Sequence, residues 1–278
     1  MTAITCDGVA LAYTDFPGPP AASFSAPALV LHGFTGAGAA MAPLVERLNI
    51  DRRVLTVDLI GHGESDSPDD QYSYTIPAMT RQLRALIKQL DLAPVHLVGY
   101  SLGGRTALAL AVDDTRLLES LTLIGASAGL ADPKQRRERR HRDNLLADDI
   151  HNEGLSKFID RWMDLEMWRS LKTRIGEDAW QASREQRLLN PGHGLAHSLR
   201  GSGTGIMPPL KGRLHRIDVP TLLVVGSEDQ KFLAIADELA AEITKARIAK
   251  IHQAGHAAHL EQPDATCVVI NEHLKRCD

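Results

Sequence analysis

The segment VHLVGYSLGGRTALAL (95–110) constrains the fold more than any other part of the sequence. A run typical of a buried strand leads directly to Ser101, and a stretch typical of a helix follows it. Residues 99–103, GYSLG, match the G-x-S-x-G pattern, in which a serine lies on a tight strand-to-helix turn. The glycines beside the serine avoid clashes between the strand and the helix. The pattern therefore predicts that the Ser101 hydroxyl projects from the end of a strand, beside the first amides of a helix.

The other apolar segments predict a parallel sheet. They are short and rich in Val, Ile and Leu, which is typical of strands covered on both faces. With the segment before Ser101 included, they span 28–33, 53–58, 95–100, 121–126 and 221–226. Amphipathic stretches lie between them, for example at 78–92 and 233–246. This alternation indicates an α/β fold with a mostly parallel, doubly wound sheet.

The alternation of strands and helices is interrupted once, between about residues 129 and 212. This part shows no convincing strand and contains all three tryptophans and the basic run KQRRERRHR (134–142). We expect a helical insertion between two core strands, and an insertion of this kind can form a lid. The expected domains are therefore a core of residues 1–128 and 213–278, and a helical cap of residues 129–212, called the insertion below.

A serine on such a turn needs a histidine as base and a carboxylate to orient the histidine. In enzymes with this motif, the acid and then the histidine follow the serine along the chain. The strand predicted at 221–226 runs into Glu228 and Asp229, and His256 follows in a loop that contains glycine. Asp229 is favoured over Glu228 because the shorter acid is the usual orienter, although spacing alone leaves both open. The predicted catalytic residues are Ser101, Asp229 and His256.

Backbone amides are expected to complete the site. The strand predicted at 28–33 ends at His32-Gly33-Phe34, where N–H groups can point toward the serine. We assign the Phe34 and Leu102 amides to an oxyanion hole, a role in which their side chains take no part.

Composition and charge exclude several other classes of protein. The chain has 278 residues and a net charge of -4, so nucleic acid and membrane partners are not expected. No apolar run approaches the length of a membrane span, and the N-terminus does not resemble a signal peptide. Three scattered cysteines, an odd number, favour reduced thiols and a cytoplasmic location.

Two further patterns are considered and set aside. GAGAAM (36–41), with Asp58 ending the next strand, partly resembles a dinucleotide-binding fingerprint, but Met41 replaces its third glycine. His193 and His197 have the spacing of a zinc-binding helix, but Gly194 replaces the glutamate of that motif. We therefore predict neither a cofactor nor a metal.

Four segments make the sequence more specific: GYSLGGR, QRRERRHRD, GSEDQKF and QAGHAAHLEQP. With DLIGHGESDSP (58–68), the chain resembles the α/β-hydrolase superfamily over nearly its whole length. Within that superfamily it resembles the 2-succinyl-6-hydroxy-2,4-cyclohexadiene-1-carboxylate synthases of menaquinone biosynthesis. The arginine of that family's E-R pair falls on Arg139, after Glu138. The substrate-binding residues expected from the resemblance are Arg105, Arg139, Arg187, Tyr100 and Trp162.

The resemblance implies a lyase that eliminates pyruvate from a cyclohexene with three carboxylates. Ser101, deprotonated by His256, would remove a proton next to the succinyl ketone without forming an acyl-enzyme, and the amides would stabilise the enolate. Guanidinium groups would hold the carboxylates. Within the basic run, we expect Arg136, Arg139 and Arg140 to share one helix face. The expected partner is a small anionic carboxylate, and the expected assembly is a monomer or a weak homo-oligomer.

Two alternatives use the same residues. A carboxylesterase or C–C hydrolase would use Ser101 as a covalent nucleophile in the same triad. A non-catalytic ligand-binding protein would have no need for the ordered serine, acid and histidine. The positive charge on the insertion favours a small anionic substrate over a lipid ester.

Overall fold

The computed structural model describes residues 2–19, 25–48 and 51–278, and within them eight strands form one sheet. The strand order is β1-β2-β4-β3-β5-β6-β7-β8. From β4 to β8 all neighbouring strands are parallel, whereas β2 pairs antiparallel with both β1 and β4. The strands are β1 Thr2–Cys6, β2 Val9–Phe16, β3 Ala28–Leu31, β4 Val54–Val57, β5 Val95–Tyr100, β6 Leu118–Ile124, β7 Thr221–Gly226 and β8 Ala246–Ile251.

The predicted fold class, a mostly parallel α/β sheet, is confirmed. β5 and β7 have the predicted bounds, whereas β6 begins three residues before the predicted 121. The sequence analysis missed the hairpin of β1 and β2. This hairpin lies at the sheet edge, where several of its residues are exposed, so it lacks the continuous apolar pattern of the central strands.

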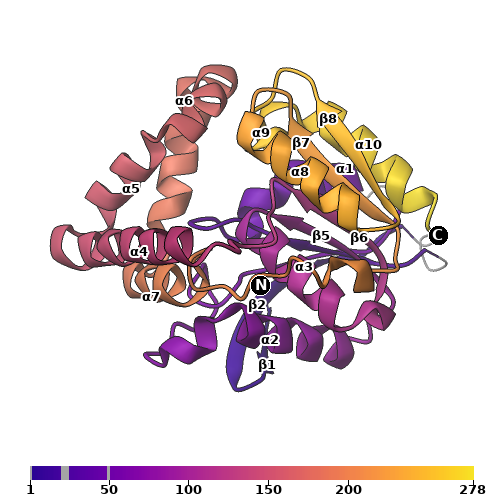
Figure 1. Cartoon of the computed structure of the whole chain (residues 1–278), viewed down its shortest axis with the longest axis horizontal. Helices are drawn as coiled ribbons and strands as arrows, with labels where there is room; N and C mark the ends of the chain where they lie inside the picture. Colours follow the sequence, from indigo (N-terminus) through magenta and orange to yellow (C-terminus); the bar gives the residue numbers. More distant parts are fainter. Residues whose placement is uncertain (1, 20–24, 49–50) are drawn as a thin grey trace.

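Helices cover both faces of the sheet (Figure 1). On one face, α2 (Ile76–Gln89), α3 (Leu102–Asp113) and α8 (Gln230–Glu242) bury their apolar residues in one cluster. On the other, α1 (Ala42–Leu48) and α10 (Pro263–Lys275) form a second cluster. Side chains alternate along each strand, as in β3, where Leu29 and Leu31 join the first cluster and Ala28 and Val30 the second. Short helices connect these elements: η2 Gly38–Met41, η3 Gln71–Tyr74, η4 Thr115–Leu117, η6 Leu214–Arg216 and α9 Ala258–Glu261.

The chain between β6 and β7 is helical and lies at the side of the sheet, to the left in Figure 1. Its elements are α4 Pro133–Glu153, α5 Leu155–Met163, η5 Glu166–Trp168, α6 Arg169–Leu188 and α7 Gly192–Ser202. The sequence defines where α4 begins, because the Asp132 side chain accepts a hydrogen bond from the Gln135 amide and Pro133 occupies the first turn. Within the described residues, no helix is both long and apolar enough to cross a membrane.

Candidate active site

Ser101 lies in the turn between β5 and α3 with a backbone conformation that is unusual for serine. Its φ is 49° and its ψ is -103°, outside the regions that L-residues favour. The turn brings backbone atoms so close that neighbouring positions require glycine. A Cβ on Gly99 would come within 2.6 Å of the Gly103 oxygen, and one on Gly103 within 2.6 Å of the His32 oxygen. These contacts explain the glycines of the motif.

Ser101, His256 and Asp229 form a chain of hydrogen-bonding groups. His256 Nε2 lies 3.3 Å from Ser101 Oγ, and His256 Nδ1 lies 3.0 Å from Asp229 Oδ2. The other carboxylate oxygen of Asp229 accepts a hydrogen bond from the Phe232 amide at 3.2 Å, which caps the start of α8. The predicted catalytic residues therefore lie together, in the geometry that lets a histidine take a proton from a serine.

Glu228, the alternative acid, points elsewhere. It forms an ion pair with Arg174 on α6 of the insertion. Arg174 also contacts Glu261 at 2.8 Å, and Glu261 accepts a hydrogen bond from the Gly255 amide at 2.9 Å. These bonds hold the loop before His256 in place.

Aromatic rings surround the imidazole of His256, which is almost entirely buried. The ring centroids of Phe232, Tyr100 and Trp168 lie 4.6, 5.5 and 6.0 Å from that of His256. Their packing restricts the imidazole to the orientation that faces both Ser101 and Asp229.

The two amides assigned to an oxyanion hole come from two segments that the fold brings together, the loop after β3 and the start of α3. Leu102 begins α3, and the first amides of a helix have no partner within the helix. Phe34 follows His32, whose oxygen accepts a hydrogen bond from the Gly103 amide at 3.0 Å, so the two segments are joined. The His32 ring accepts a hydrogen bond from the Leu59 amide at 2.9 Å, and burial lowers its pKa to about 4. The His32 side chain therefore stays neutral and supports the loop.

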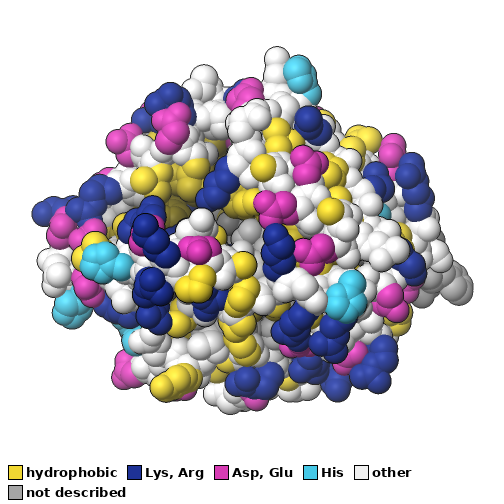
Figure 2. Space-filling view, viewed as in Figure 1, with side chains coloured by type: hydrophobic (Ala, Val, Ile, Leu, Met, Phe, Trp, Pro, Cys, Tyr) yellow, Lys and Arg dark blue, Asp and Glu magenta, His cyan; other side chains and the backbone are white. Residues whose placement is uncertain are grey.

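Ser101 and His256 open into a cavity of about 680 Å³ between the core and the insertion. Figure 2 shows this hollow with hydrophobic side chains at its floor and Lys and Arg side chains around it. Phe34, Tyr100 and Trp162 are among the aromatic residues that line it. The volume suits a small ligand rather than a polymer.

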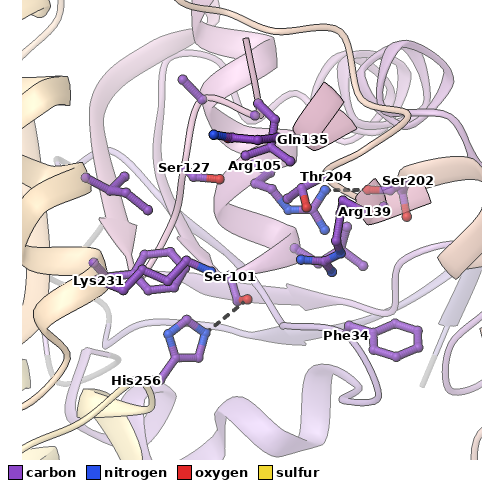
Figure 3. Close-up of a pocket in the computed structure, with 18 of the residues that line it drawn as sticks. Phe34, Ser101, Arg105, Ser127, Gln135, Arg139, Ser202, Thr204, Lys231 and His256 are labelled. Carbon is purple, nitrogen blue, oxygen red and sulfur yellow. Dashed lines mark hydrogen bonds between the residues drawn. The ribbon is translucent and has the colours of Figure 1, made fainter. Parts of the chain in front are cut away.

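Two arginines in the cavity lie near one buried carboxylate, which pairs directly with only one of them. Arg139 Nε donates to Asp143 Oδ1 at 2.8 Å, and Arg105 donates to the Ser202 backbone oxygen (Figure 3). Burial, with a smaller effect from the charge of Arg139, lowers the pKa of Arg105 to about 10, although Asp143 acts in the opposite direction. Because burial also raises the pKa of Asp143, this carboxyl is a weak counterion for two cations. The pair of arginines is therefore suited to bind a further anion.

The sequence analysis missed a third cation, Lys231. Its side chain approaches Ser101 from the side opposite to Arg139 in Figure 3. Burial lowers the pKa of its ammonium group, and Arg139 acts in the same direction. The sequence feature that could have identified Lys231 is its position two residues after Asp229, in the first turn of α8.

The expected face of the basic run is wrong. Arg139 lines the main cavity together with Gln135, Glu138 and Arg142, as the i, i+3, i+4, i+7 spacing of a helix requires. Arg136 and Arg140 line a separate surface cavity with Arg137. The run alone did not show which side of α4 faces the core.

Arg187 does not line the cavity of Ser101. It is buried beside an adjoining cavity of about 370 Å³, and Phe34, Tyr100 and Trp168 line both cavities. Its guanidinium donates to Thr35 Oγ1 and lies 5.2 Å from the centroid of the Trp168 ring. Burial lowers the pKa of Arg187, and it raises that of the Tyr100 hydroxyl.

The segment that partly resembles a dinucleotide fingerprint is tied into the fold. Asp58 is buried and accepts hydrogen bonds from the Gly38 amide at 2.6 Å and the Glu64 amide at 2.9 Å. Its carboxylate is therefore not available to a ribose.

This fold and this arrangement of serine, histidine and acid define a protein of the α/β-hydrolase class. The model of the "alpha/beta hydrolase fold" family matches residues 27–263, which is most of the chain.

Comparison with known proteins then gives the particular family. The chain is 39% identical, over 96% of both chains, to a provisionally assigned 2-succinyl-6-hydroxy-2,4-cyclohexadiene-1-carboxylate synthase of Bacillus subtilis. It is 34% identical to the synthase of that name from Salmonella typhimurium, over 89% of this chain and 92% of that one. The structure of MenH from S. aureus superposes with a TM-score of 0.89 at 30% identity, over 95% of this chain and 98% of that one. The chain belongs to the same family as these synthases, and the resemblance seen in the sequence is confirmed.

Proposed function

We propose that this chain eliminates pyruvate from 2-succinyl-5-enolpyruvyl-6-hydroxy-3-cyclohexene-1-carboxylate, as a lyase of menaquinone biosynthesis. The observation that carries the proposal is that the Ser101–His256–Asp229 chain opens into a cavity lined by Arg105, Arg139 and Lys231. The triad supplies a base and the cations suit a substrate with several carboxylates. Family membership points to the same reaction.

The reaction begins with a proton transfer. His256 Nε2 takes the proton of Ser101 Oγ, and the serine oxygen removes the proton from the carbon next to the succinyl ketone. Asp229 holds the imidazole and stabilises its charged form. The electron pair of the broken C–H bond moves to the ketone oxygen, where the Phe34 and Leu102 amides stabilise the enolate.

Pyruvate then leaves by elimination. The enolate re-forms the ketone, the electrons shift through the ring, and the C–O bond to the enolpyruvyl group breaks. The leaving group is the enolate of pyruvate, which takes up a proton at carbon, so the proton count balances. No bond between Ser101 and the substrate forms at any stage.

The cations give the substrate its orientation. Asp143 pairs with Arg139 and lies near Arg105, and a substrate carboxylate between the two arginines would supply the second negative charge. Lys231 approaches from the other side, and Trp162 and Tyr100 provide apolar surface for the ring. Arg187 lines the adjoining cavity, which shares Tyr100 and Phe34 with the cavity of Ser101. From that position, Arg187 would attract a further carboxylate of the substrate.

The insertion has the position of a cap. Residues 129–212 supply Arg139, Trp162 and Trp168 to the cavity, while the core supplies the triad. We propose that the insertion encloses the substrate and excludes water from the enolate. The free thiols of Cys6, Cys267 and Cys277 support a cytoplasmic location.

A hydrolase with a covalent acyl-serine is the second candidate. The serine, the histidine and the two amides have the arrangement that acyl transfer also needs. The two candidates differ in the product and in the state of Ser101. Only the lyase releases pyruvate while Ser101 stays unmodified.

The test is pyruvate release from the enolpyruvyl cyclohexene substrate, generated in situ and coupled to lactate dehydrogenase. The proposal expects rapid release by wild type and almost none by Ser101→Ala. Ser156→Ala, on the exposed side of α5, is the matched control and should behave as wild type. Absence of pyruvate with folded wild-type protein would contradict the proposal, and small anionic esters and diketones would then be the substrates to examine.

A further inference from the structure

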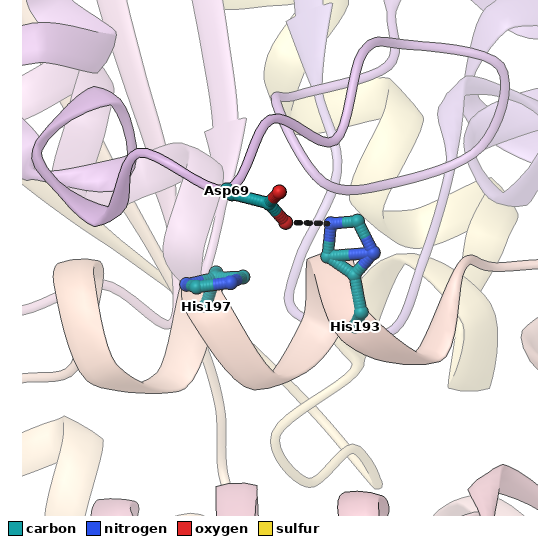
Figure 4. Close-up of side chains that lie close together, drawn as sticks. All are labelled: Asp69, His193 and His197. Carbon is teal, nitrogen blue, oxygen red and sulfur yellow. Dashed lines mark ion pairs between the residues drawn. The ribbon is translucent and has the colours of Figure 1, made fainter.

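A second cluster of ligand-type side chains lies outside the catalytic cavity. His193 and His197 are one turn apart on α7, and Asp69 approaches them from the loop before η3 (Figure 4). One ligand atom from each residue lies within 4.8 Å of the others, and His193 Nε2 is 3.8 Å from Asp69 Oδ1. From the sequence, the histidine pair was set aside as a metal site because the glutamate of the zinc motif is missing, and Asp69 was not considered because it comes from a distant part of the chain.

Tyr74 holds two parts of the cluster in place. Its ring stacks on that of His197, with centroids 5.2 Å apart and planes 24° apart. Its hydroxyl donates to the Pro68 oxygen at 2.8 Å, directly before Asp69. One buried side chain therefore positions both the histidine and the loop that carries the carboxylate.

Close backbone packing fixes α7 against the same loop. A Cβ on Gly194 would come within 2.7 Å of the Gly61 oxygen, so the two segments touch through their backbones. The Gly63 amide also donates to Asn190 Oδ1 at 2.8 Å, just before α7 begins. The fold thus sets the positions of the backbone segments that carry the histidines and Asp69.

Asp69 differs from the acids on either side of it. Asp66 accepts a hydrogen bond from the Ala10 amide at 2.7 Å, and Asp70 accepts one from the Tyr72 amide at 3.2 Å. Within the described residues, the Asp69 carboxylate has only the long contact to His193. It is exposed, so it can rotate toward a ligand.

We propose that Asp69, His193 and His197 bind a divalent transition-metal ion, for which Zn²⁺ is the best match, and that the ion ties α7 to the loop before η3. Two imidazoles and a carboxylate, with water in the fourth position, are a recurrent zinc ligand set. Bonds of about 2.0–2.2 Å in a tetrahedron place donors about 3.4 Å apart. The ligand atoms lie up to 4.8 Å apart, and rotation of the exposed Asp69 and His193 side chains would shorten these distances to about 3.4 Å.

The site has a consequence for the catalytic cavity. Ser198, Leu199 and Ser202 of α7 line that cavity, and the Ser202 oxygen accepts the hydrogen bond from Arg105. An ion at His193 and His197 would fix the position of a helix that also shapes the substrate pocket. The site is therefore structural, and the ion takes no part in proton transfer.

The experiment is a calorimetric Zn²⁺ titration of chelator-treated protein near neutral pH. Wild type should take up one ion per chain, and Asp69→Asn and His193→Ala should each weaken binding at least about tenfold, since even loss of an outer partner of a metal ligand costs 10–100-fold. His141→Ala, an exposed histidine on α4, is the control and should bind as wild type. At one Zn²⁺ concentration, the ion should raise the Tm of wild type and His141→Ala equally, and that of Asp69→Asn by less.

Two results would overturn the proposal. One is the absence of saturable binding to wild type. The other is equal Zn²⁺ affinity in Asp69→Asn, His193→Ala and His141→Ala, which would place the ion elsewhere. Equal Tm values of the metal-free variants exclude misfolding as the reason for lost binding.

Discussion

At the scale of single residues, Asp229 links His256, the proposed base, to the start of α8. One carboxylate oxygen contacts His256 and the other caps α8, so the residue that orients the imidazole is itself held by a helix amide. A longer side chain at position 229 would have to shift either His256 or the start of α8 to keep both contacts. The position of the acid is therefore set by the start of α8.

We expect Asp229→Asn to lower kcat by about 10⁴-fold, because an amide in place of the carboxylate favours the wrong tautomer of His256. Steady-state pyruvate formation measures this effect. The control is Glu228→Gln, which changes the neighbouring acid that pairs with Arg174. Similar kcat values for the two variants would show that Asp229 does not orient the histidine.

The sequence could predict that Ser101, Asp229 and His256 lie together, for a physical reason. The strained serine turn needs small neighbours, and each acid or histidine follows a recognisable strand. The choice between Glu228 and Asp229 could not be made in this way, because both follow β7 and only the contacts of α6 and α8 separate them. Lys231 and Asp143 were missed because their roles depend on burial, which the sequence does not state.

At the scale of elements, the contact between α3 and the loop after β3 aligns the site. The Gly103 amide donates to the His32 oxygen, and no side chain fits between the two backbones. The same contact joins the two segments that carry the Phe34 and Leu102 amides.

Gly103→Ala tests this contact. Its Cβ would lie 2.6 Å from the His32 oxygen, so α3 must shift, and we expect a loss of about 1–3 kcal/mol in the free energy of unfolding. Activity should fall as well. Gly192→Ala on α7 is the control, because its Cβ would make only ordinary contacts of 3.5 Å or more. Denaturant unfolding compares the two, and equal stabilities would contradict the account.

The face of α4 that lines the cavity gives a second test at this scale. Arg139→Ala should raise KM about 10- to 100-fold, since a hydrogen bond to a charged group contributes about 1.5–3 kcal/mol. It should also lower the Tm, because Asp143 stays buried without its partner. Arg140→Ala, one residue further and exposed, should leave KM unchanged. Equal KM values for the two variants would show that the proposed face is wrong.

At the scale of the whole molecule, the proposed reaction takes its reacting groups from the core and part of its charge from the insertion, which both line the cavity. The insertion was visible in the sequence as an interruption of the strand-helix alternation. The face of α4 and the separation of Arg187 from the main cavity were not, because they depend on how the helices pack. The sequence contains the periodicity of each helix but not the neighbour that each face meets.

Buried neutral histidines should make the whole molecule sensitive to acid. Burial lowers the pKa of His32 and His273 to about 4 and that of His62 and His259 to about 3. The unfolded chain binds these protons near pH 6.5 and the folded chain does not, so stability is lost as pH falls below 6.5. By pH 5.5 each histidine lowers the free energy of unfolding by roughly 1 kcal/mol, and the four together by a few kcal/mol, a large part of a typical total stability.

Urea unfolding at pH 7.5, 6.5 and 5.5 measures this dependence. The free energy of unfolding should fall steeply between the last two values, and His273→Gln, far from the cavity, should reduce the slope by about one proton. A free energy that stays constant over this range would contradict the assignment of these histidines as neutral.

The most direct test of the central claim is the intact mass of the enzyme during turnover, measured while pyruvate accumulates. The claim is that Ser101 acts as a base in a cavity built for a polyanion. It predicts that wild-type protein keeps its unmodified mass at every time point while pyruvate forms, and that Ser101→Ala forms almost none. A transient adduct on Ser101 that forms and decays at the rate of product release would contradict the claim and identify a covalent mechanism.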